Sequence, residues 1–192
     1  METGGMKKEY WEKRKNNFYY RYLELLLRIF ASEAKSILDV GSNATPILEY
    51  CDWIPDRTSI DIRNPYRSET VKGIKINFFD FNPENKFDIV TCLQVLEHIP
   101  LAGDFSKKLF AVSKSVIISV PYKWGIDKRI NHFHDVDEEV LFSWTRRKPD
   151  HSIIVPEKDN KKRLIAYYRD RKKIASEDFF GFFNENIEKL HK

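Results

Sequence analysis

The stretch FDIVTCLQVLEHIP, residues 87–100, decides the fold class. Its first half is a nearly continuous apolar run, and its second half is a more polar turn that ends at Pro100. Such a run is typical of a strand that is buried on both faces of a parallel sheet. The sequence therefore predicts an α/β domain. Its expected strands are residues 36–40, 58–62, 73–76, 87–92 and 116–120, with a helix at 104–113.

The segments on either side extend this pattern. Apolar residues recur at three- and four-residue steps over residues 17–31, which predicts an amphipathic entry helix. Thr45–Pro46 suits the start of a helix after the first strand. Residues 152–155 and 164–168 indicate a closing antiparallel pair. A last helix is expected over residues 176–190.

Length and composition fit one globular domain with a core. The chain has 192 residues, of which 42% are hydrophobic and 32% charged. The net charge of +4 is too small to indicate nucleic acid or membrane as a partner, and two cysteines are too few for a disulfide framework. We expect a cytoplasmic protein with a single domain over 1–192, divided into an N-terminal lid helix (1–34), a catalytic core (35–169) and a helical tail (170–192).

The loop after the first strand is the first candidate site. Asp39, Gly41, Ser42 and Asn43 lie where a strand hands over to a helix, which is where open α/β sheets bind ligands. Glycine gives this loop a flexible backbone, and its N–H groups and the helix start would favour a negative cofactor carboxylate. Asn43 tolerates the left-handed conformation better than most other residues.

These segments together resemble the class I S-adenosylmethionine-dependent methyltransferases. Residues 37–45 resemble motif I of that family, although Asn43 and Thr45 stand where the family commonly has glycine. Residues 87–100 resemble its fourth strand and following turn, including the Leu-Glu-His triplet at 96–98. The resemblance implies a Rossmann-like seven-stranded sheet, mostly parallel with the last strand antiparallel, and S-adenosylmethionine as cofactor. An NAD-dependent dehydrogenase fits less well because G-x-G-x-x-G is absent.

Further cofactor contacts follow in order along the chain. Asp61 ends the second expected strand, where a carboxylate can accept from ribose hydroxyls, and Ile62 could cover an adenine face. The resemblance implies that Asp80 and Phe81 read the adenine. The remaining expected cofactor contacts are Leu93 and Arg14.

The acceptor site is expected beyond the fourth and fifth strands. His132 and His134 are the leading candidates for a catalytic base, because a neutral imidazole can take a proton near neutral pH. His132, His134, Asp135 and Asp137 could also be ligands of a metal ion, but no outlying residue completes the set and methyl transfer needs no metal, so none is expected. The aromatic N-terminal segment resembles a helix that lids the cofactor, and Tyr19 could pair with a histidine there.

The predicted reaction is O- or N-methylation of a small polar metabolite. A weaker resemblance, to compact bacterial enzymes of surface polysaccharide pathways, favours a sugar or phosphorylated intermediate as the acceptor. Basic side chains suited to a phosphate are Lys123, Lys128, Arg129, Arg146, Arg147 and Lys148. A homodimer is an open expectation. The alternatives are an RNA methyltransferase and a non-catalytic partner subunit with the same fold.

Overall fold

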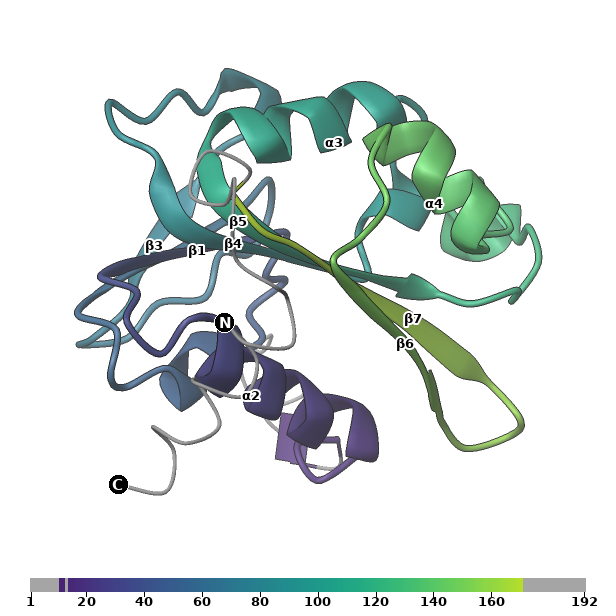
Figure 1. Cartoon of the computed structure of the whole chain (residues 1–192), viewed down its shortest axis with the longest axis horizontal. Coiled ribbons are helices and arrows are strands. Elements are labelled where there is room, and N and C mark those ends of the chain that lie inside the picture. Colours follow the sequence, from purple (N-terminus) through teal and green to yellow (C-terminus); the bar gives the residue numbers. More distant parts are fainter. Residues whose placement is uncertain (1–10, 13, 171–192) are drawn as a thin grey trace.

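The computed structural model describes residues 11–12 and 14–170 (Figure 1). Within them, α denotes an α-helix, η a 3-10 helix and β a strand. The elements are α2 (Phe18–Phe30), β1 (Ser36–Val40), η1 (Ile47–Tyr50), β2 (Asp56–Asp61), β3 (Lys72–Lys75), η2 (Phe78–Asp80), β4 (Phe87–Leu93), η3 (Leu96–His98), α3 (Ala102–Ala111), β5 (Ser113–Pro121), η4 (Lys128–Ile130), α4 (Glu138–Thr145), β6 (His151–Pro156) and β7 (Lys162–Tyr168).

The strands form one seven-stranded sheet in the order β3-β2-β1-β4-β5-β7-β6. The five strands from β3 to β5 are parallel, and β7 runs antiparallel to both of its neighbours. The chain order reverses between β1 and β4, so a crevice opens where their carboxyl ends meet. The expected sheet, with its antiparallel last strand, is confirmed.

Alternation along the strands gives the sheet two apolar faces, because successive side chains point to opposite sides. One apolar cluster joins α2 to Ile37 of β1, Ile89 of β4, Ile117 of β5 and Ile165 of β7. The neighbouring Leu38 belongs to the cluster on the other face. Figure 1 shows α2 on one face and α3 with α4 on the other. Both faces of the sheet are therefore covered.

Helix α2 is fixed to its face of the sheet. It buries Tyr19, Leu23, Leu26, Leu27, Ile29 and Phe30. Each such side chain stabilises the fold by roughly 1.5–3 kcal/mol relative to full exposure. The part of the expected lid that forms α2, Phe18–Phe30, therefore packs against one face of the sheet.

Two helices differ from the sequence-based expectation. The helix expected after Thr45 is only the 3-10 turn η1, because the chain turns back at Cys51 to start β2. The eight-residue α4 was not predicted; its N-cap is Asp137, whose carboxylate accepts from the N–H groups of Glu139 and Val140. The helix expected at 176–190 lies outside the described residues.

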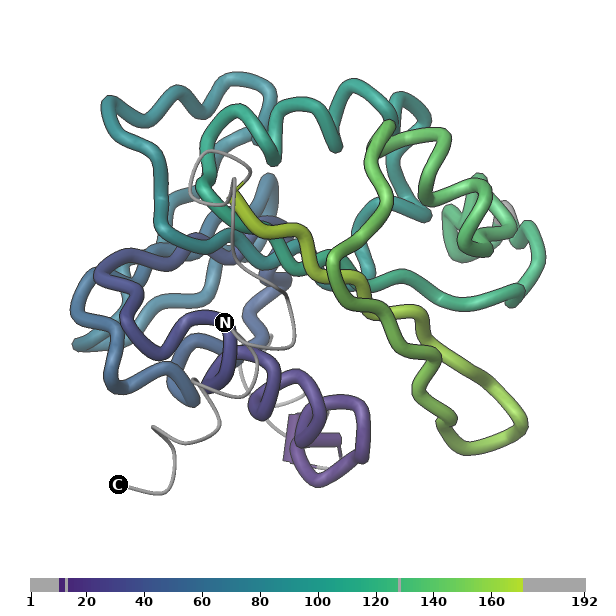
Figure 2. The backbone as a smooth tube through the Cα atoms, in the orientation of Figure 1, coloured from purple at the N-terminus to yellow at the C-terminus, as the bar shows by residue number. Residues whose placement is uncertain are grey.

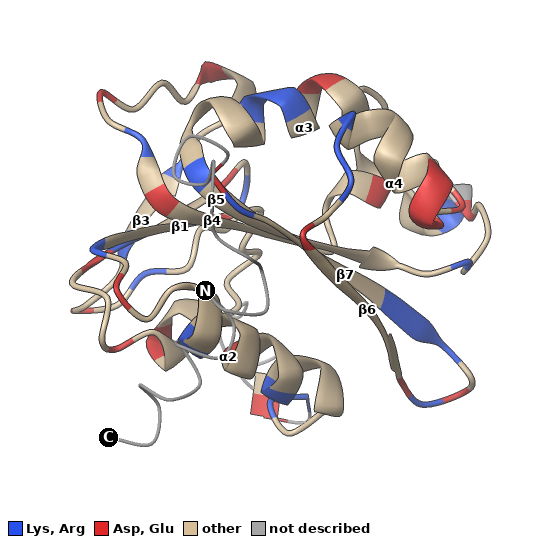
Figure 3. Cartoon of the chain, in the orientation of Figure 1, with Lys and Arg blue, Asp and Glu red and all other residues tan. Residues whose placement is uncertain are grey.

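The β6–β7 hairpin extends beyond the rest of the sheet (Figure 2). Its strands pair from His151 with Tyr167 to Pro156 with Lys162, which confirms the expected antiparallel pair. Basic residues mark the start of β7 (Figure 3), where Lys161, Lys162 and Arg163 follow one another. No helix among the described residues has the length and apolar character needed to cross a membrane.

Candidate active site

The candidate site lies at the carboxyl ends of β1, β4 and β5. The loop after β1 and the turn after β4 touch there. A Cβ atom built on Gly41 would lie 2.5 Å from a methyl carbon of Val95, so only glycine allows this approach. Gly41 also has a φ of +80°, a conformation that glycine adopts without strain.

The loop after β1 has an unusual backbone. Asn43 and Ala44 have φ angles of +43° and +60°, so these two residues, like Gly41, have a left-handed backbone conformation. Asn43 thus adopts the conformation that its residue type tolerates. Ala44 has no such tolerance, and its strain is offset by the bond from its N–H to the Asn64 carbonyl at 2.7 Å.

Asp61 ties this loop to the turn after β2. One carboxylate oxygen accepts from the Asn43 N–H at 3.0 Å, and the other accepts from the N–H groups of Arg63 and Asn64. A carboxylate offers about four acceptor positions, so these three bonds leave room for one hydroxyl. Asp61 is thus both a support of the loop and a group that could accept from a ribose.

The loop does not offer free N–H donors. Gly41 and Ser42 donate to the Ile60 carbonyl, and Thr45 donates to the Ser42 carbonyl, so every N–H from residue 41 to 45 has a partner. The 3-10 turn that follows is too short for a helix dipole. In this structure the N–H groups of the loop are therefore bonded within the protein, and the expected helix start is a 3-10 turn.

Asp39 lies beneath the loop in the sheet and is 2% exposed. Its carboxylate accepts from the Thr91 hydroxyl at 2.7 Å, on the neighbouring β4 residue. Burial raises the pKa of Asp39 to about 7. Ser42 is also buried, and its hydroxyl accepts from the Tyr66 N–H, so both residues shape the site from below.

The other expected cofactor residues lie in several places, and Phe81 packs against Phe87 at the amino end of β4, away from this edge, with 6.4 Å between the ring centroids. Ile62 is 59% exposed after β2, and Asp80 is exposed at the end of η2. Phe81 is half-buried against the core, and Leu93 ends β4. Arg14 lies in the turn before α2.

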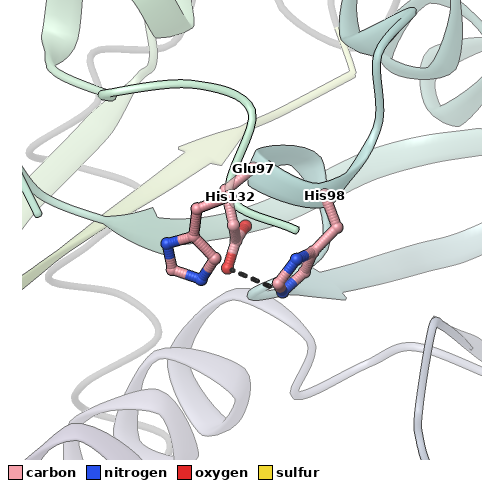
Figure 4. Close-up of side chains that lie close together, drawn as sticks. All are labelled: Glu97, His98 and His132. Carbon is pink, nitrogen blue, oxygen red and sulfur yellow. Dashed lines mark ion pairs between the residues drawn. The ribbon is translucent and has the colours of Figure 1, made fainter. Parts of the chain in front are cut away.

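Three side chains that could bind a cation or move a proton meet beyond β4 (Figure 4). Glu97 and His98 come from η3, and His132 comes from the loop after η4. One ligand atom from each lies within 4.8 Å of the other two. The bond from the Phe133 N–H to the Glu97 carbonyl brings the two segments together.

Burial sets the ionisation of this cluster. Glu97 is 1% exposed, and burial raises its pKa to about 8, although the nearby charge of Arg163 acts in the other direction. Burial, followed by the neighbouring His98, lowers the pKa of His132. A neutral His132 is the form that can accept a proton.

Tyr19 joins α2 to the same edge of the sheet. Its hydroxyl is 2.5 Å from that of Ser119 on β5, and the Gln94 side-chain amide donates to the same Ser119 oxygen at 3.0 Å. The Arg163 guanidinium lies 4.7 Å from the Tyr19 ring centroid. Because Tyr19 is fully buried and burial raises its pKa, we assign it a positioning role.

His134 is not part of the cluster. Its Nε2 donates to the Ile99 carbonyl at 3.0 Å, and its ring packs edge-on against Trp144 of α4. Asp135 accepts from the Gly125 N–H, while Asp137 caps α4. Three of the four residues considered from the sequence as metal ligands, His134, Asp135 and Asp137, therefore make structural contacts, and only His132 lies in the cluster with Glu97 and His98.

Two cavities lie near this edge. One, of about 480 Å³, is lined by His132 together with Tyr122, Lys123, Trp124, Asp127, Ile130, Asn160, Lys161 and Lys162. A larger one, of about 620 Å³, lies between α3 and α4. The smaller cavity adjoins the Glu97–His98–His132 cluster through His132, whereas the larger one is lined by none of the three.

A seven-stranded sheet in this order, in which only β7 is antiparallel, is the class I methyltransferase architecture, with a ligand crevice between β1 and β4. Residues 10–154 match the family model described as "Methyltransferase domain". The chain belongs to that family and is a methyltransferase. No curated protein has a significantly similar sequence.

Solved structures share the fold at low sequence identity. The N-methyltransferase NodS from Bradyrhizobium japonicum, in complex with S-adenosylhomocysteine, is 16% identical with a TM-score of 0.65, covering 83% of this chain and 91% of that one. The 1,6-didemethyltoxoflavin N1-methyltransferase from Burkholderia thailandensis is 18% identical (TM-score 0.61, 81% and 80%). The N-terminal domain of EvdMO1, with S-adenosylhomocysteine and D-fucose, is 14% identical (TM-score 0.58, 79% and 82%).

From the sequence, Glu97 was considered only as part of the Leu-Glu-His triplet, and no site role was predicted for Arg163. The signal for Glu97 was a carboxylate inside an otherwise apolar turn, directly before a histidine. No such signal marks Arg163, because its place beside Tyr19 depends on the pairing of β7 with β5.

Proposed function

We propose that the protein transfers a methyl group from S-adenosylmethionine to an oxygen or nitrogen atom of a small polar acceptor. The observation that carries this proposal is the contact between Gly41 and Val95. It joins the cofactor loop after β1 to the turn that holds Glu97 and His98, so donor and acceptor would meet at one edge of the sheet.

The described residues fit this cofactor. Because residue 41 is a glycine, the loop after β1 can lie directly against Val95. Asp61 retains an acceptor position for a ribose hydroxyl. Exposed Ile62 and Asp80 lie at the ends of β2 and η2, where an adenine would be covered and read. Because the loop amides are engaged, Arg14 is the group we assign to the cofactor carboxylate.

When bound, S-adenosylmethionine supplies an electrophilic methyl group on a sulfonium. The protein then has to align the acceptor atom with that methyl and exclude water, since methyl transfer is an in-line displacement. His132, buried and bordering the smaller cavity, is placed to receive the acceptor's proton. Trp124 stacks beside it, with 6.2 Å between the ring centroids, and restricts the movement of its ring.

The acceptor proposed here is a sugar or a phosphorylated intermediate of surface polysaccharide biosynthesis. Lys123, Lys161 and Lys162 line the cavity and could bind phosphate oxygens. Lys161 lies 4.5 Å from the Trp124 ring centroid, which leaves its ammonium group near the cavity. The EvdMO1 domain, solved with D-fucose, gives a precedent for a sugar in this fold.

We further propose a cytoplasmic location, where such intermediates and the methyl donor are made, and a homodimer as the assembled form. Exposed Phe18 and Leu25 on the outer side of α2 could contribute to a subunit contact. Sedimentation analysis tests the second point.

Methyl transfer from labelled S-adenosylmethionine to panels of sugars, sugar phosphates and small amines tests the acceptor class. His132→Ala is expected to slow turnover by about 100-fold or more, because a positioned base contributes that much. His134→Ala is the matched control and is expected to retain turnover within a few fold, since its imidazole bonds a loop carbonyl. Equal losses in the two variants would contradict the role of His132.

A further inference from the structure

Glu97 has a buried carboxylate without a sufficient partner. Its Oε2 atom is inaccessible and accepts no hydrogen bond within the described residues. Its other oxygen lies 3.8 Å from His98 Nε2, beyond hydrogen-bond distance. The nearest guanidinium, Arg163, forms its ion pair with Glu157 at 3.2 Å instead. A buried carboxylate of this kind is costly unless a proton or a cation neutralises it.

His98 is oriented as a ligand. Its Nδ1 lies 3.0 Å from the carbonyl oxygen of Asn131, and since a carbonyl only accepts, Nδ1 must carry the proton. The lone pair of a neutral His98 is then on Nε2, the atom that faces Glu97. A backbone carbonyl that fixes the far nitrogen in this way is the usual support of a metal-binding histidine.

His132 completes the set from another part of the chain. Two backbone bonds with Asp127 fix the position of His132, which is 7% exposed. None of the described residues forms a hydrogen bond with its ring. The ring lies edge-on to His98, with 4.8 Å between the ring centroids (Figure 4).

We propose that Glu97, His98 and His132 bind a divalent first-row transition-metal ion. Two imidazoles and one carboxylate are a recurring ligand set that leaves coordination positions open. Bonds of about 2.0–2.2 Å to one ion place ligand atoms roughly 3–4 Å apart. The three ligand atoms already lie within 4.8 Å, so small side-chain rotations suffice.

This site gives the proposed function a more definite chemistry, and in that respect it rests on the proposed function. An open coordination position binds the hydroxyl oxygen of the acceptor and makes it more acidic. The hydroxyl proton passes to solvent water, and the oxygen's electron pair forms the new O–CH₃ bond. The electron pair of the S–CH₃ bond stays on sulfur, which becomes a neutral thioether. His132 is then a ligand rather than the base, and the acceptor is a hydroxyl compound such as a sugar.

Titration of the tag-free, EDTA-treated full chain with Co²⁺, followed by visible absorption and equilibrium dialysis, tests the site. We expect one bound ion per chain with bands typical of nitrogen and oxygen ligands. Glu97→Gln and His98→Gln should each weaken binding by more than about tenfold, since even the loss of a group that only orients a ligand costs as much. The two substitutions test the site separately, because His98 is 39% exposed and tolerates change more easily than Glu97.

The matched controls are His151→Gln and His191→Gln. The side chain of His151, on β6, contacts the Tyr22 hydroxyl of α2, and His191 lies outside the described residues. Both should bind Co²⁺ as the unaltered protein does. Absence of binding, or an affinity for Co²⁺ that is unchanged from the unaltered protein in Glu97→Gln and His98→Gln, would overturn the site. Titration of the same samples with S-adenosylhomocysteine separates the two proposals: binding of the nucleoside without Co²⁺ removes only the metal, and binding of Co²⁺ without the nucleoside removes the proposed function.

Discussion

At the scale of single residues, the site depends on a few positions where the side chain, or its absence, fixes the backbone of two loops. Gly41 combines a left-handed backbone with a contact that leaves no space for a methyl group. Asp61 has its two carboxylate oxygens shared among three backbone donors. Each of these residues holds two loops in one arrangement, so its effect reaches beyond its own contacts.

Gly41→Ala should lower the free energy of unfolding by about 2 kcal/mol or more, because the left-handed conformation costs a non-glycine residue roughly 1–2 kcal/mol and Val95 must also move. Gly103→Ala is the matched control. It lies in α3 with nothing within 4 Å of the added carbon, so it should stabilise by roughly 0.5–1 kcal/mol. Urea unfolding of both variants measures the difference, and a tolerated Gly41→Ala would disprove the close contact.

The buried Asp39 predicts a pH dependence of stability. Its pKa in the folded protein, about 7, is above the usual value of 3.8, so its contribution is present below pH 4 and is lost as the pH rises through 7. The loss is at most about 4 kcal/mol, at 1.36 kcal/mol per pKa unit. The stability of Asp39→Asn relative to the unaltered protein should therefore increase between pH 5 and pH 8.

Urea unfolding of both proteins across this range measures the effect, and taking their difference cancels the contributions of other titrating groups. Asp52→Asn, which removes a carboxylate at an exposed position, is the matched control. Parallel pH profiles for Asp39→Asn and the unaltered protein would mean that Asp39 is not buried as described.

At the scale of elements, the sheet was predictable and the short helices were not. β1 was expected at its observed bounds, and β4 to within one residue, because continuous apolar runs mark buried parallel strands. η1 could not be predicted as a single 3-10 turn, since its residues Ile47 and Leu48 suit a longer helix equally well. α4 is short and its outer side is exposed, so its sequence has little periodic signal.

The attachment of α2 to the sheet gives a prediction at this scale. Tyr19→Phe keeps the ring but removes the bond to Ser119, and should cost about 1 kcal/mol, or a fall in Tm of roughly 2–4 °C. Turnover should fall less than about tenfold, because the hydroxyl positions α2 rather than touching the acceptor. Tyr50→Phe is the control, since its hydroxyl has no hydrogen bond in the described structure.

A Tyr19→Phe variant with normal stability and strongly reduced turnover would reverse this assignment. It would place the Tyr19 hydroxyl among the groups that contact the acceptor; the histidine partner expected from the sequence is replaced in the structure by Ser119.

At the scale of the whole molecule, sequence patterns predicted which residues lie at the strand ends better than which loop residues meet beyond them. Asp39, Gly41 and Asp61 occur in order at strand ends, and parallel strands bring such positions to one edge. The meeting of Glu97 with His132 depends on the path of a 34-residue segment that includes β5 and a loop. Local patterns do not determine such a path, which is why His134 seemed an equal candidate.

The central claim is that this chain binds S-adenosylmethionine through the loop after β1. Calorimetric titration of the full chain with S-adenosylhomocysteine tests it most directly, with NAD as the control ligand and Asp61→Ala as the variant. We predict micromolar affinity, equivalent to roughly −8 kcal/mol, clear weakening in a folded Asp61→Ala, and no binding of NAD. No binding of S-adenosylhomocysteine, tight binding of NAD alone, or unchanged affinity in Asp61→Ala would contradict the account.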